Sequence, residues 1–259
     1  IQEEVPAMNN TPAVIVTGAS RGLGAAVARW LAKAGAGVNL VARSEGDLTE
    51  VATDLAPLAG QSLVCAGDVA DYDTCRKAVR ETMQRFGRID SLVNNAGIVQ
   101  PIAAIAACDP VRWRRNLDVN LVGPFNLIRA ALRQLRKRNG RVVNVSSGAA
   151  NLALANVSAY CSAKAALNHF TRVLAAEEAT LTALTIRPGV VDTDMQTYLR
   201  REGATALPSD QAAYYRQLKE NGQLEPPEIP ARAIAWLALH APSEFSGQFV
   251  DYDDPRISD

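Results

Sequence analysis

The sequence predicts a single α/β domain in which helices cover both faces of a doubly wound parallel sheet. Three observations predict this fold. Short apolar runs of strand length recur along the chain, and segments of helical length separate them. Continuous apolar strands are typical of a parallel sheet buried on both faces, because the connecting helices cover each face. The length of 259 residues suits one well-buried domain, and no Pro-, Gly- or Ser-rich linker divides it.

The elements follow one another in regular alternation. In chain order, the expected strands are residues 13–16, 38–41, 62–65, 91–93, 142–145, 184–186 and 248–250. The expected helices are residues 23–34, 47–58, 74–86, 110–135, 158–178 and 231–239, the fourth interrupted near Gly123 and Pro124. The polar segment 196–227 shows no clear period, and we expect an irregular insertion that serves as a lid or substrate loop.

Composition argues against several classes of protein. The formal net charge is +0 and no basic stripe stands out, which does not suggest nucleic-acid binding. No apolar stretch reaches the roughly 18 residues that a membrane span needs. The four cysteines form no CxxC pair and the two histidines lie far apart, so we expect no metal site. Reduced cysteines are consistent with a cytoplasmic protein.

The N-terminal residues differ from the rest of the chain. We expect residues 1–10 to be a flexible extension and residues 11–259 to form the single domain. The extension carries Glu3, Glu4 and Pro6 and lacks an apolar stretch, so we do not interpret it as a signal peptide.

A glycine-rich turn joins the first strand to the first helix. Gly18, Gly22 and Gly24 have the spacing GxxxGxG rather than the commoner GxGxxG. Glycine permits a tight turn and a close approach of the backbone to a pyrophosphate, and the start of the helix favours negative charge. Such a turn after the first strand of a βαβ unit indicates a Rossmann-type, dinucleotide-binding domain.

The end of the second strand bears on which dinucleotide binds. A carboxylate usually stands there to bond the adenosine ribose, but this chain has Ala42 followed by Arg43. Arg43, together with Arg21 in the glycine turn, could clamp a 2′-phosphate by charge-assisted hydrogen bonds. The two arginines therefore favour NADP(H), the alternative being that both are solvated loop residues.

Ser147, Tyr160 and Lys164, in the second half of the chain, together indicate carbonyl chemistry. Tyr160 and Lys164 are four apart, so both side chains project from one face of a helix. A nearby ammonium favours the phenolate and lowers the pKa of a tyrosine, which then serves as a general acid or base near neutrality. Ser147 follows an apolar strand, and a carbonyl oxygen held between its hydroxyl and that of Tyr160 would suit a hydride acceptor.

Together these motifs resemble the short-chain dehydrogenase/reductase family over residues 13–253. The motif at Thr17–Gly24 resembles its cofactor turn, Asn94–Gly97 the motif after its fourth strand, and Pro188–Met195 the segment beside its nicotinamide. Asn120, Ser147, Tyr160 and Lys164 match its four catalytic positions in order and spacing.

The resemblance implies a role for each catalytic position. Ser147 would polarise the substrate carbonyl and Tyr160 would donate the proton. Lys164 would bond the nicotinamide ribose and lower the pKa of Tyr160, and Asn120 would hold a water that relays protons to Lys164.

The resemblance also implies the residues that contact the cofactor. Asp68 would bond the adenine amino group, Asn94 would pack along the adenosine, and Val191 and Thr193 would bond the carboxamide. The full expected set is Gly18, Ser20, Arg21, Gly22, Leu23, Gly24, Arg43, Asp68, Val69, Asn94, Ala96, Gly97, Tyr160, Lys164, Pro188, Gly189, Val191 and Thr193.

Within the family, the chain is most similar to the sepiapterin reductase group, some of whose fungal and bacterial members reduce benzil-type diketones. The resembling stretches are residues 160–161, 174–178, 194–196 and 246–251. In that group the carboxylate at the position of Asp251 anchors a pterin; the alternative is a surface carboxylate at a strand end. The expected substrate residues are Ser147, Tyr160, Met195, Gln196, Tyr198 and Asp251, with simple packing as the alternative for Met195, Gln196 and Tyr198.

The sequence thus predicts an NADPH-dependent carbonyl reductase acting on a small ketone or vicinal dicarbonyl. An NAD-dependent alcohol dehydrogenase is the alternative enzyme. A non-catalytic NADP-sensing regulator is a further alternative, although such proteins usually lose the tyrosine or the lysine. Alanine-rich helices at residues 125–135 and 158–176 predict a homo-oligomer, because the family commonly pairs these helices across a twofold axis.

Overall fold

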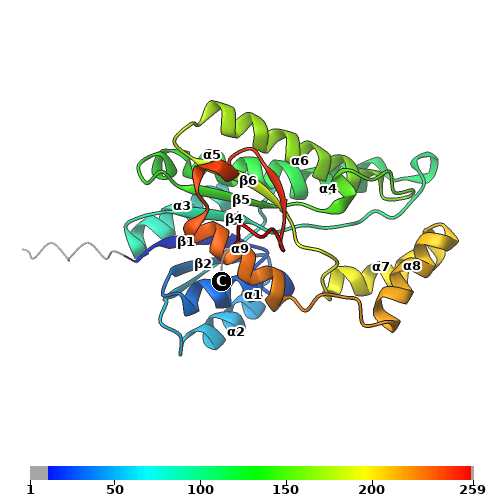
Figure 1. The fold of residues 1–259 in the computed structure, drawn as a ribbon, viewed down its shortest axis with the longest axis horizontal. Coiled ribbons are helices and arrows are strands. Elements are labelled where there is room, and N and C mark those ends of the chain that lie inside the picture. Colours follow the sequence, from blue (N-terminus) through cyan, green and yellow to red (C-terminus); the bar gives the residue numbers. More distant parts are fainter. Residues whose placement is uncertain (1–10, 258–259) are drawn as a thin grey trace, which may run out of the picture.

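The computed structural model describes residues 11–257, so the expectation of a flexible extension over residues 1–10 lies outside the described part. Seven parallel strands form one sheet in the order β3-β2-β1-β4-β5-β6-β7 (Figure 1). The strands are β1 (Ala13–Thr17), β2 (Gly37–Ala42), β3 (Ser62–Ala66), β4 (Ser91–Asn94), β5 (Arg141–Val145), β6 (Thr182–Arg187) and β7 (Phe249–Asp251). The predicted doubly wound parallel sheet is confirmed.

Helices cover both faces of this sheet. The helices are α1 (Gly22–Lys33), α2 (Glu45–Leu55), α3 (Tyr72–Phe86), α4 (Pro110–Leu117), α5 (Gly123–Arg136), α6 (Ser158–Glu177), α7 (Asp194–Ala206), α8 (Ser209–Glu220) and α9 (Glu228–His240). In Figure 1, α1, α2 and α9 lie on one side of the sheet, and α3, α4, α5 and α6 lie on the other.

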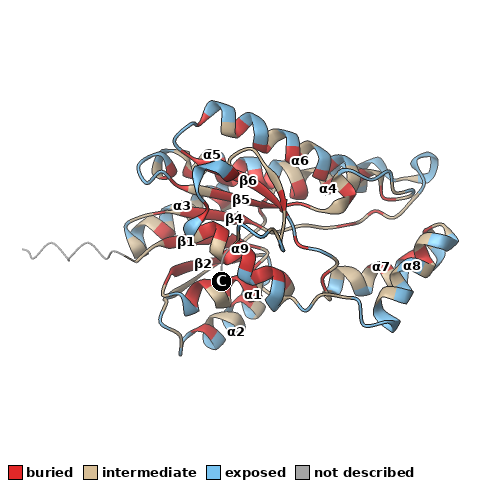
Figure 2. Cartoon of the chain, viewed as in Figure 1, coloured by how far each residue is buried: buried red, intermediate tan, exposed pale blue. Residues whose placement is uncertain are grey.

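The hydrophobic core therefore has two layers, one on each face of the sheet. Successive strand residues alternate between them: Val14 and Val16 pack with α1 and α9, whereas Ile15 packs with α3 and α5. Every residue of β1 is buried, and so are the residues of β4 (Figure 2). Burial of the strands on both faces explains why their sequences read as continuous apolar runs.

The expected long helix over residues 110–135 is divided, as predicted, near Gly123 and Pro124. A π-helical turn, Asp118–Val122, separates α4 from α5, and Pro124 stands in the first turn of α5. Proline is tolerated there because the first turn of a helix has no intrahelical acceptor for its missing N–H.

The prediction that residues 196–227 are irregular is wrong. Most of this segment is helical, in α7 and α8, which pack against each other beside the main body (Figure 1). Only Leu199 and Gly203 of α7 and Ala212 of α8 are buried. With so few buried positions, the helical period is too weak to be recognised from the sequence.

The strand order changes direction between β1 and β4. The chain runs outward from β1 to β3, then returns to the other side of β1 and continues to β7. In a doubly wound sheet, the crevice at this switch point lies beyond the carboxyl ends of the strands and binds ligands. No helix within residues 11–257 is long and apolar enough to cross a membrane.

Candidate active site

A cleft of about 1720 Å³ opens at the carboxyl ends of the strands. Its walls come from the glycine turn, from the ends of β2, β4, β5 and β6, and from α6, α7 and α8. Among the described residues, Asn94 and Asn120 are the two expected site residues that do not line it. The expected residues that line it are Gly18, Ser20, Arg21, Gly22, Leu23, Gly24, Arg43, Asp68, Val69, Ala96, Gly97, Ser147, Tyr160, Lys164, Pro188, Gly189, Val191, Thr193, Met195, Gln196, Tyr198 and Asp251.

The glycine turn has the conformation that a phosphate-binding loop requires. Gly18 has φ +65° and Gly22 has φ +53°. Residues with a Cβ disfavour this left-handed backbone conformation, whereas glycine adopts it readily. A Cβ on Gly24 would lie 2.2 Å from the carbonyl oxygen of Gly18, so the turn can close only with glycine there. No side chain caps the start of α1, which leaves its first N–H groups available to a pyrophosphate. The turn therefore fits a dinucleotide.

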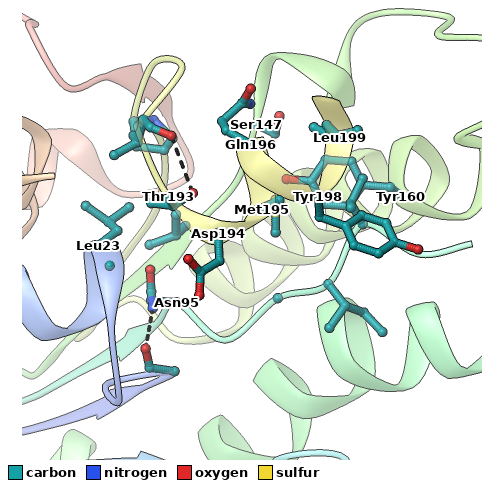
Figure 3. Close-up of a pocket in the computed structure, with 18 of the residues that line it drawn as sticks. Leu23, Asn95, Ser147, Tyr160, Thr193, Asp194, Met195, Gln196, Tyr198 and Leu199 are labelled. Atoms are coloured by element: carbon teal, nitrogen blue, oxygen red, sulfur yellow. Dashed lines mark hydrogen bonds between the residues drawn. The ribbon is translucent and has the colours of Figure 1, made fainter. Parts of the chain in front are cut away.

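Asn95 holds this turn in place, a role that sequence reasoning missed. Its Nδ2 donates to the carbonyl oxygens of Thr17 at 2.9 Å and Gly18 at 3.2 Å. Figure 3 shows the Asn95 side chain with one hydrogen bond marked. Asn94 lies on the other side of the strand, where its Nδ2 donates to Oδ1 of Asn144 at 2.7 Å. Successive residues of a strand point to opposite faces, which explains why the first asparagine of the pair is buried and the second lines the cleft.

Tyr160 and Lys164 project from α6 into the cleft. The Nζ of Lys164 donates to the carbonyl oxygen of Val145 at 2.7 Å and lies 5.7 Å from the centre of the Tyr160 ring. Ser147 follows β5, and its hydroxyl accepts a hydrogen bond from the N–H of Ala149 at 3.2 Å. A hydrogen bond also joins the side chains of Ser147 and Tyr160. The strand end and the helix thus bring two hydroxyls and one amine together.

Burial governs the protonation of these groups. It raises the pKa of Tyr160 to about 12, and the bond to Ser147 opposes that rise only in part. Burial also lowers the pKa of Lys164 to about 8. The sequence predicted a lowered pKa for Tyr160, whereas in this structure the pKa is raised, because desolvation of the phenol outweighs the opposing effect of Ser147. Tyr160 is consequently a protonated hydroxyl, ready to donate, at neutral pH.

Asn120 lies behind the wall of the cleft rather than in it. It belongs to the π-helical turn and is fully buried. Its Nδ2 donates to Asn116 and to the carbonyl oxygen of Ile98 at 2.8 Å, so its orientation is fixed. A Cβ on Gly97 would lie 2.8 Å from Oδ1 of Asn120 and 3.8 Å from Nζ of Lys164. Asn120 is therefore close to Lys164 with only a glycine between them.

Charged side chains surround the end of the cleft near β2 and β3. Arg43 makes no ion pair with another described residue, whereas Nε of Arg21 lies 3.1 Å from Oδ2 of Asp194. Asp68 accepts a hydrogen bond from the N–H of Ala70 and pairs with Arg115, which also lines the cleft. Sequence reasoning missed Arg115, because its place on α4 gives no sign that it reaches β3.

The opposite end of the cleft is apolar and aromatic. Tyr160, Met195 and Tyr198 pack in one cluster with Leu199 of α7 and Tyr215 of α8. Figure 3 shows Met195, Tyr198 and Leu199 on α7 beside Tyr160. Sequence reasoning did not assign Tyr215 to the site, since α8 was expected to be irregular. This end of the cleft is suited to a substrate with apolar groups.

Gln196 and Asp251, two further residues expected to contact the substrate, are polar and also line the cleft. The Oε1 of Gln196 is enclosed and has no hydrogen-bond partner among the described residues. Asp251, at the end of β7, forms a two-pronged ion pair with Arg187 at the end of β6. The carboxylate expected to anchor a pterin is thus already engaged by a guanidinium. Within residues 11–257 no cluster of His, Cys, Asp or Glu is placed to hold a metal ion.

The chain matches known proteins in sequence and structure. A sequence model described as short chain dehydrogenase matches residues 12–204. An uncharacterized oxidoreductase of Saccharomyces cerevisiae is 37% identical over 250 residues, covering 95% of this chain and 97% of that protein. A benzil reductase of the same yeast, described as (S)-benzoin forming, is 32% identical over 256 residues, covering 94% and 97%. The crystal structure of the KRED1-Pglu enzyme has a TM-score of 0.88 at 42% identity, covering 93% of this chain and 100% of that one.

The chain therefore belongs to the short-chain dehydrogenase family, as its motifs predict. It is an oxidoreductase of a family that uses NAD(P)(H) to act on alcohol or carbonyl groups of small molecules.

Proposed function

We propose that the protein is an NADPH-dependent carbonyl reductase that acts on a ketone or a vicinal dicarbonyl. The observation that carries this proposal is the meeting of Ser147, Tyr160 and Lys164 in the cleft that the glycine turn also lines. Similarity to a benzil reductase supports a dicarbonyl substrate. The aromatic wall formed by Tyr198 and Tyr215 suits a substrate that bears a ring.

The residues of the chain would orient the carbonyl and supply the proton. The hydroxyl of Ser147 would donate to the carbonyl oxygen and hold it beside Tyr160. Because the pKa of Tyr160 is raised to about 12, its hydroxyl keeps its proton at neutral pH and can give it to the alkoxide that forms. When bound, NADPH supplies the hydride. The same hydroxyl would act as the acid in carbonyl reduction and, as its conjugate base, would accept the proton in alcohol oxidation.

The preference for NADPH over NADH is proposed from the charges at the end of β2. Ala42 offers no carboxylate to the ribose, and Arg43 is a cation without an ion-pair partner among the described residues. A 2′-phosphate would gain a charge-assisted hydrogen bond from Arg43, worth about 1.5–3 kcal/mol. Replacement of Arg43 by Ala should therefore weaken NADPH binding about tenfold or more and leave NADH binding nearly unchanged. An unchanged ratio of the two dissociation constants would refute the cofactor assignment.

The catalytic assignment is tested by Tyr160→Phe. This variant lacks the proton donor, so turnover of benzil and related diketones should fall by about 10²–10⁴-fold. NADPH binding, measured by fluorescence titration, should change little. Undiminished turnover would rule out Tyr160 as the acid. Cofactor binding by the wild type without turnover of any carbonyl in a broad panel would favour a regulatory protein instead.

We further propose that the protein is a cytoplasmic homo-oligomer, with α5 and α6 at the subunit interface. Phe125 of α5 is 43% exposed and Val173 of α6 is 41% exposed. The ring of Phe125 meets that of Phe170 edge to face, with their centres 6.2 Å apart. Light scattering after size exclusion should give at least twice the mass of 27.7 kDa. Phe125→Glu should shift the protein to the monomer; a wild-type monomer would exclude this interface.

A further inference from the structure

The glycine turn and the start of α7 meet across the cleft. Arg21 is the residue that precedes α1, and Asp194 is the first residue of α7. Nε of Arg21 lies 3.1 Å from Oδ2 of Asp194. A Cβ on Gly22 would lie 3.2 Å from Cγ2 of Thr193, so the two backbone segments are also close. In Figure 3, Asp194 projects from the start of α7 on the side of the cleft that Leu23 and Asn95 line.

This ion pair changes the charge available to a ligand at Arg21. The side chains of Arg21 and Asp194 are 67% and 72% exposed, and both line the cleft. An exposed pair of this kind is weak and is easily exchanged for another partner. Arg43, the other cation proposed to contact the 2′-phosphate, forms no ion pair with another described residue. The two arginines thus differ: Arg21 is paired with a carboxylate, and Arg43 forms no such ion pair among the described residues.

We propose that Asp194 is a specificity-determining residue that limits the preference for NADPH over NADH. Its carboxylate competes with the 2′-phosphate for Arg21, and it repels that phosphate when the cofactor binds. NADH lacks the 2′-phosphate, so its binding does not require Arg21 to leave Asp194. This inference rests on the proposed use of NADPH, and it adds a residue that opposes the two arginines.

The experiment is a measurement of cofactor binding by Asp194→Asn in the full-length protein. The change removes the negative charge and keeps the size of the side chain. Fluorescence titration should show NADPH binding about three- to tenfold tighter than in the wild type, since one unit charge near a phosphate at the surface has an effect of this order. The dissociation constant of NADH should change less than about twofold. The gain should shrink at high salt, which screens exposed charges.

Asp210→Asn is the matched control. Asp210 stands in the first turn of α8, lines the same cleft and is exposed, but it forms no ion pair with Arg21. Its replacement removes the same charge from the same wall, so it should leave the ratio of NADPH to NADH affinity unchanged. A double-mutant cycle completes the test: in an Arg21→Ala background, Asp194→Asn should lose its effect on that ratio.

Three results would overturn the inference. The first is an unchanged ratio in Asp194→Asn. The second is an equal gain for both cofactors, which would place Arg21 at a phosphate that NADPH and NADH share. The third is an equal effect of Asp210→Asn, which would indicate the general charge of the wall rather than the ion pair. Because these titrations require no turnover, a protein that bound NADPH but reduced no carbonyl would refute the proposed reductase and leave this inference standing.

Discussion

Lys164 and Val145 join the catalytic helix to the sheet: Nζ of Lys164 donates to the carbonyl oxygen of Val145 at 2.7 Å. Val145 ends β5, two residues before Ser147, so this bond sets the amine of α6 beside the serine. Lys164 is only 4% exposed. A buried ammonium with one acceptor has lost most of its hydration, which is why burial lowers its pKa to about 8.

The first prediction is that Lys164→Met stabilises the protein at pH 7. The pKa of Lys164 falls from 10.5 in the unfolded chain to about 8 in the folded one, which costs roughly 3 kcal/mol when both states are protonated. Methionine removes that cost. It also leaves the buried Val145 carbonyl without its hydrogen-bond donor, which destabilises the folded protein by about 1–3 kcal/mol. We therefore expect a net gain of about 1 kcal/mol in the free energy of unfolding.

The sign of this effect depends on pH. Between about pH 8 and pH 10.5 the unfolded chain holds a proton that folded Lys164 has released, so the wild type gains stability as pH rises. Below about pH 8 the full cost remains. Urea denaturation at pH 7 and near pH 10 should show the methionine variant losing its advantage at the higher pH. A pH-independent difference between the two proteins would contradict the shifted pKa.

The second prediction concerns a buried chain of hydrogen bonds that connects the sheet to α6. Asn94 donates to Asn144 at 2.7 Å, and Asn144 donates to Oγ1 of Thr171 at 2.8 Å. Thr171→Val would leave the Asn144 amide without an acceptor in a buried site, and we expect a loss of about 1–3 kcal/mol of stability. Thr53→Val is the control, because its hydroxyl bonds to its own helix at the surface. Equal losses of stability in both variants would show that the buried hydrogen bonds of Asn144 contribute no more to stability than a surface hydrogen bond does.

The third prediction concerns the cysteines. Burial raises the pKa of Cys65 to about 11 and that of Cys75 to about 12, so neither forms a useful fraction of thiolate near neutral pH. Cys108 and Cys161 are only partly buried. A thiol reagent such as dithionitrobenzoate should modify Cys108 and Cys161 in the native protein, and all four cysteines once it is unfolded. Rapid labelling of Cys65 in the native protein would contradict the packing of β3 against α3.

The sheet and its covering helices were predictable because each element buries a complete face. The features that the sequence did not predict are helices with few buried residues and contacts between residues far apart in the chain. The helix α7 buries only Leu199 and Gly203, so its period is faint, and the pairing of Arg21 with Asp194 joins residues 173 positions apart in the chain. The sequence predicted a lowered pKa for Tyr160, whereas burial raises it. A sequence shows that an amine is near the phenol but does not show that the phenol is desolvated.

Asn94 and Asn95 show that the sequence also failed to predict which of two adjacent side chains faces the cleft. Sequence reasoning assigned Asn94 to the adenosine, whereas Asn95 is the side chain that fixes the glycine turn. Only the register of β4 determines which of two adjacent residues faces the cleft, and a single sequence does not specify that register.

The fourth prediction is that Gly97→Ala impairs turnover more than cofactor binding. The added Cβ would lie 2.8 Å from Oδ1 of Asn120, which is fixed by its bonds to Asn116 and Ile98 and cannot move away cheaply. Asn120 or the backbone of Gly97 must therefore shift, at a cost of about 1–3 kcal/mol in stability. Because Nζ of Lys164 is 3.8 Å from the same point, the shift should also disturb the amine, and we expect kcat to fall about tenfold or more.

Gly46→Ala serves as the control for this change. Its Cβ would meet nothing within 4 Å, and Gly46 lies in α2, where alanine is favoured, so the variant should be slightly more stable and fully active. Steady-state kinetics with NADPH and a diketone, together with thermal unfolding, would separate the two effects. A Gly97→Ala enzyme with normal kcat would mean that the close approach of Gly97 to Asn120 and Lys164 has no part in catalysis, and Asn120 would then be a purely structural residue of the π-helical turn.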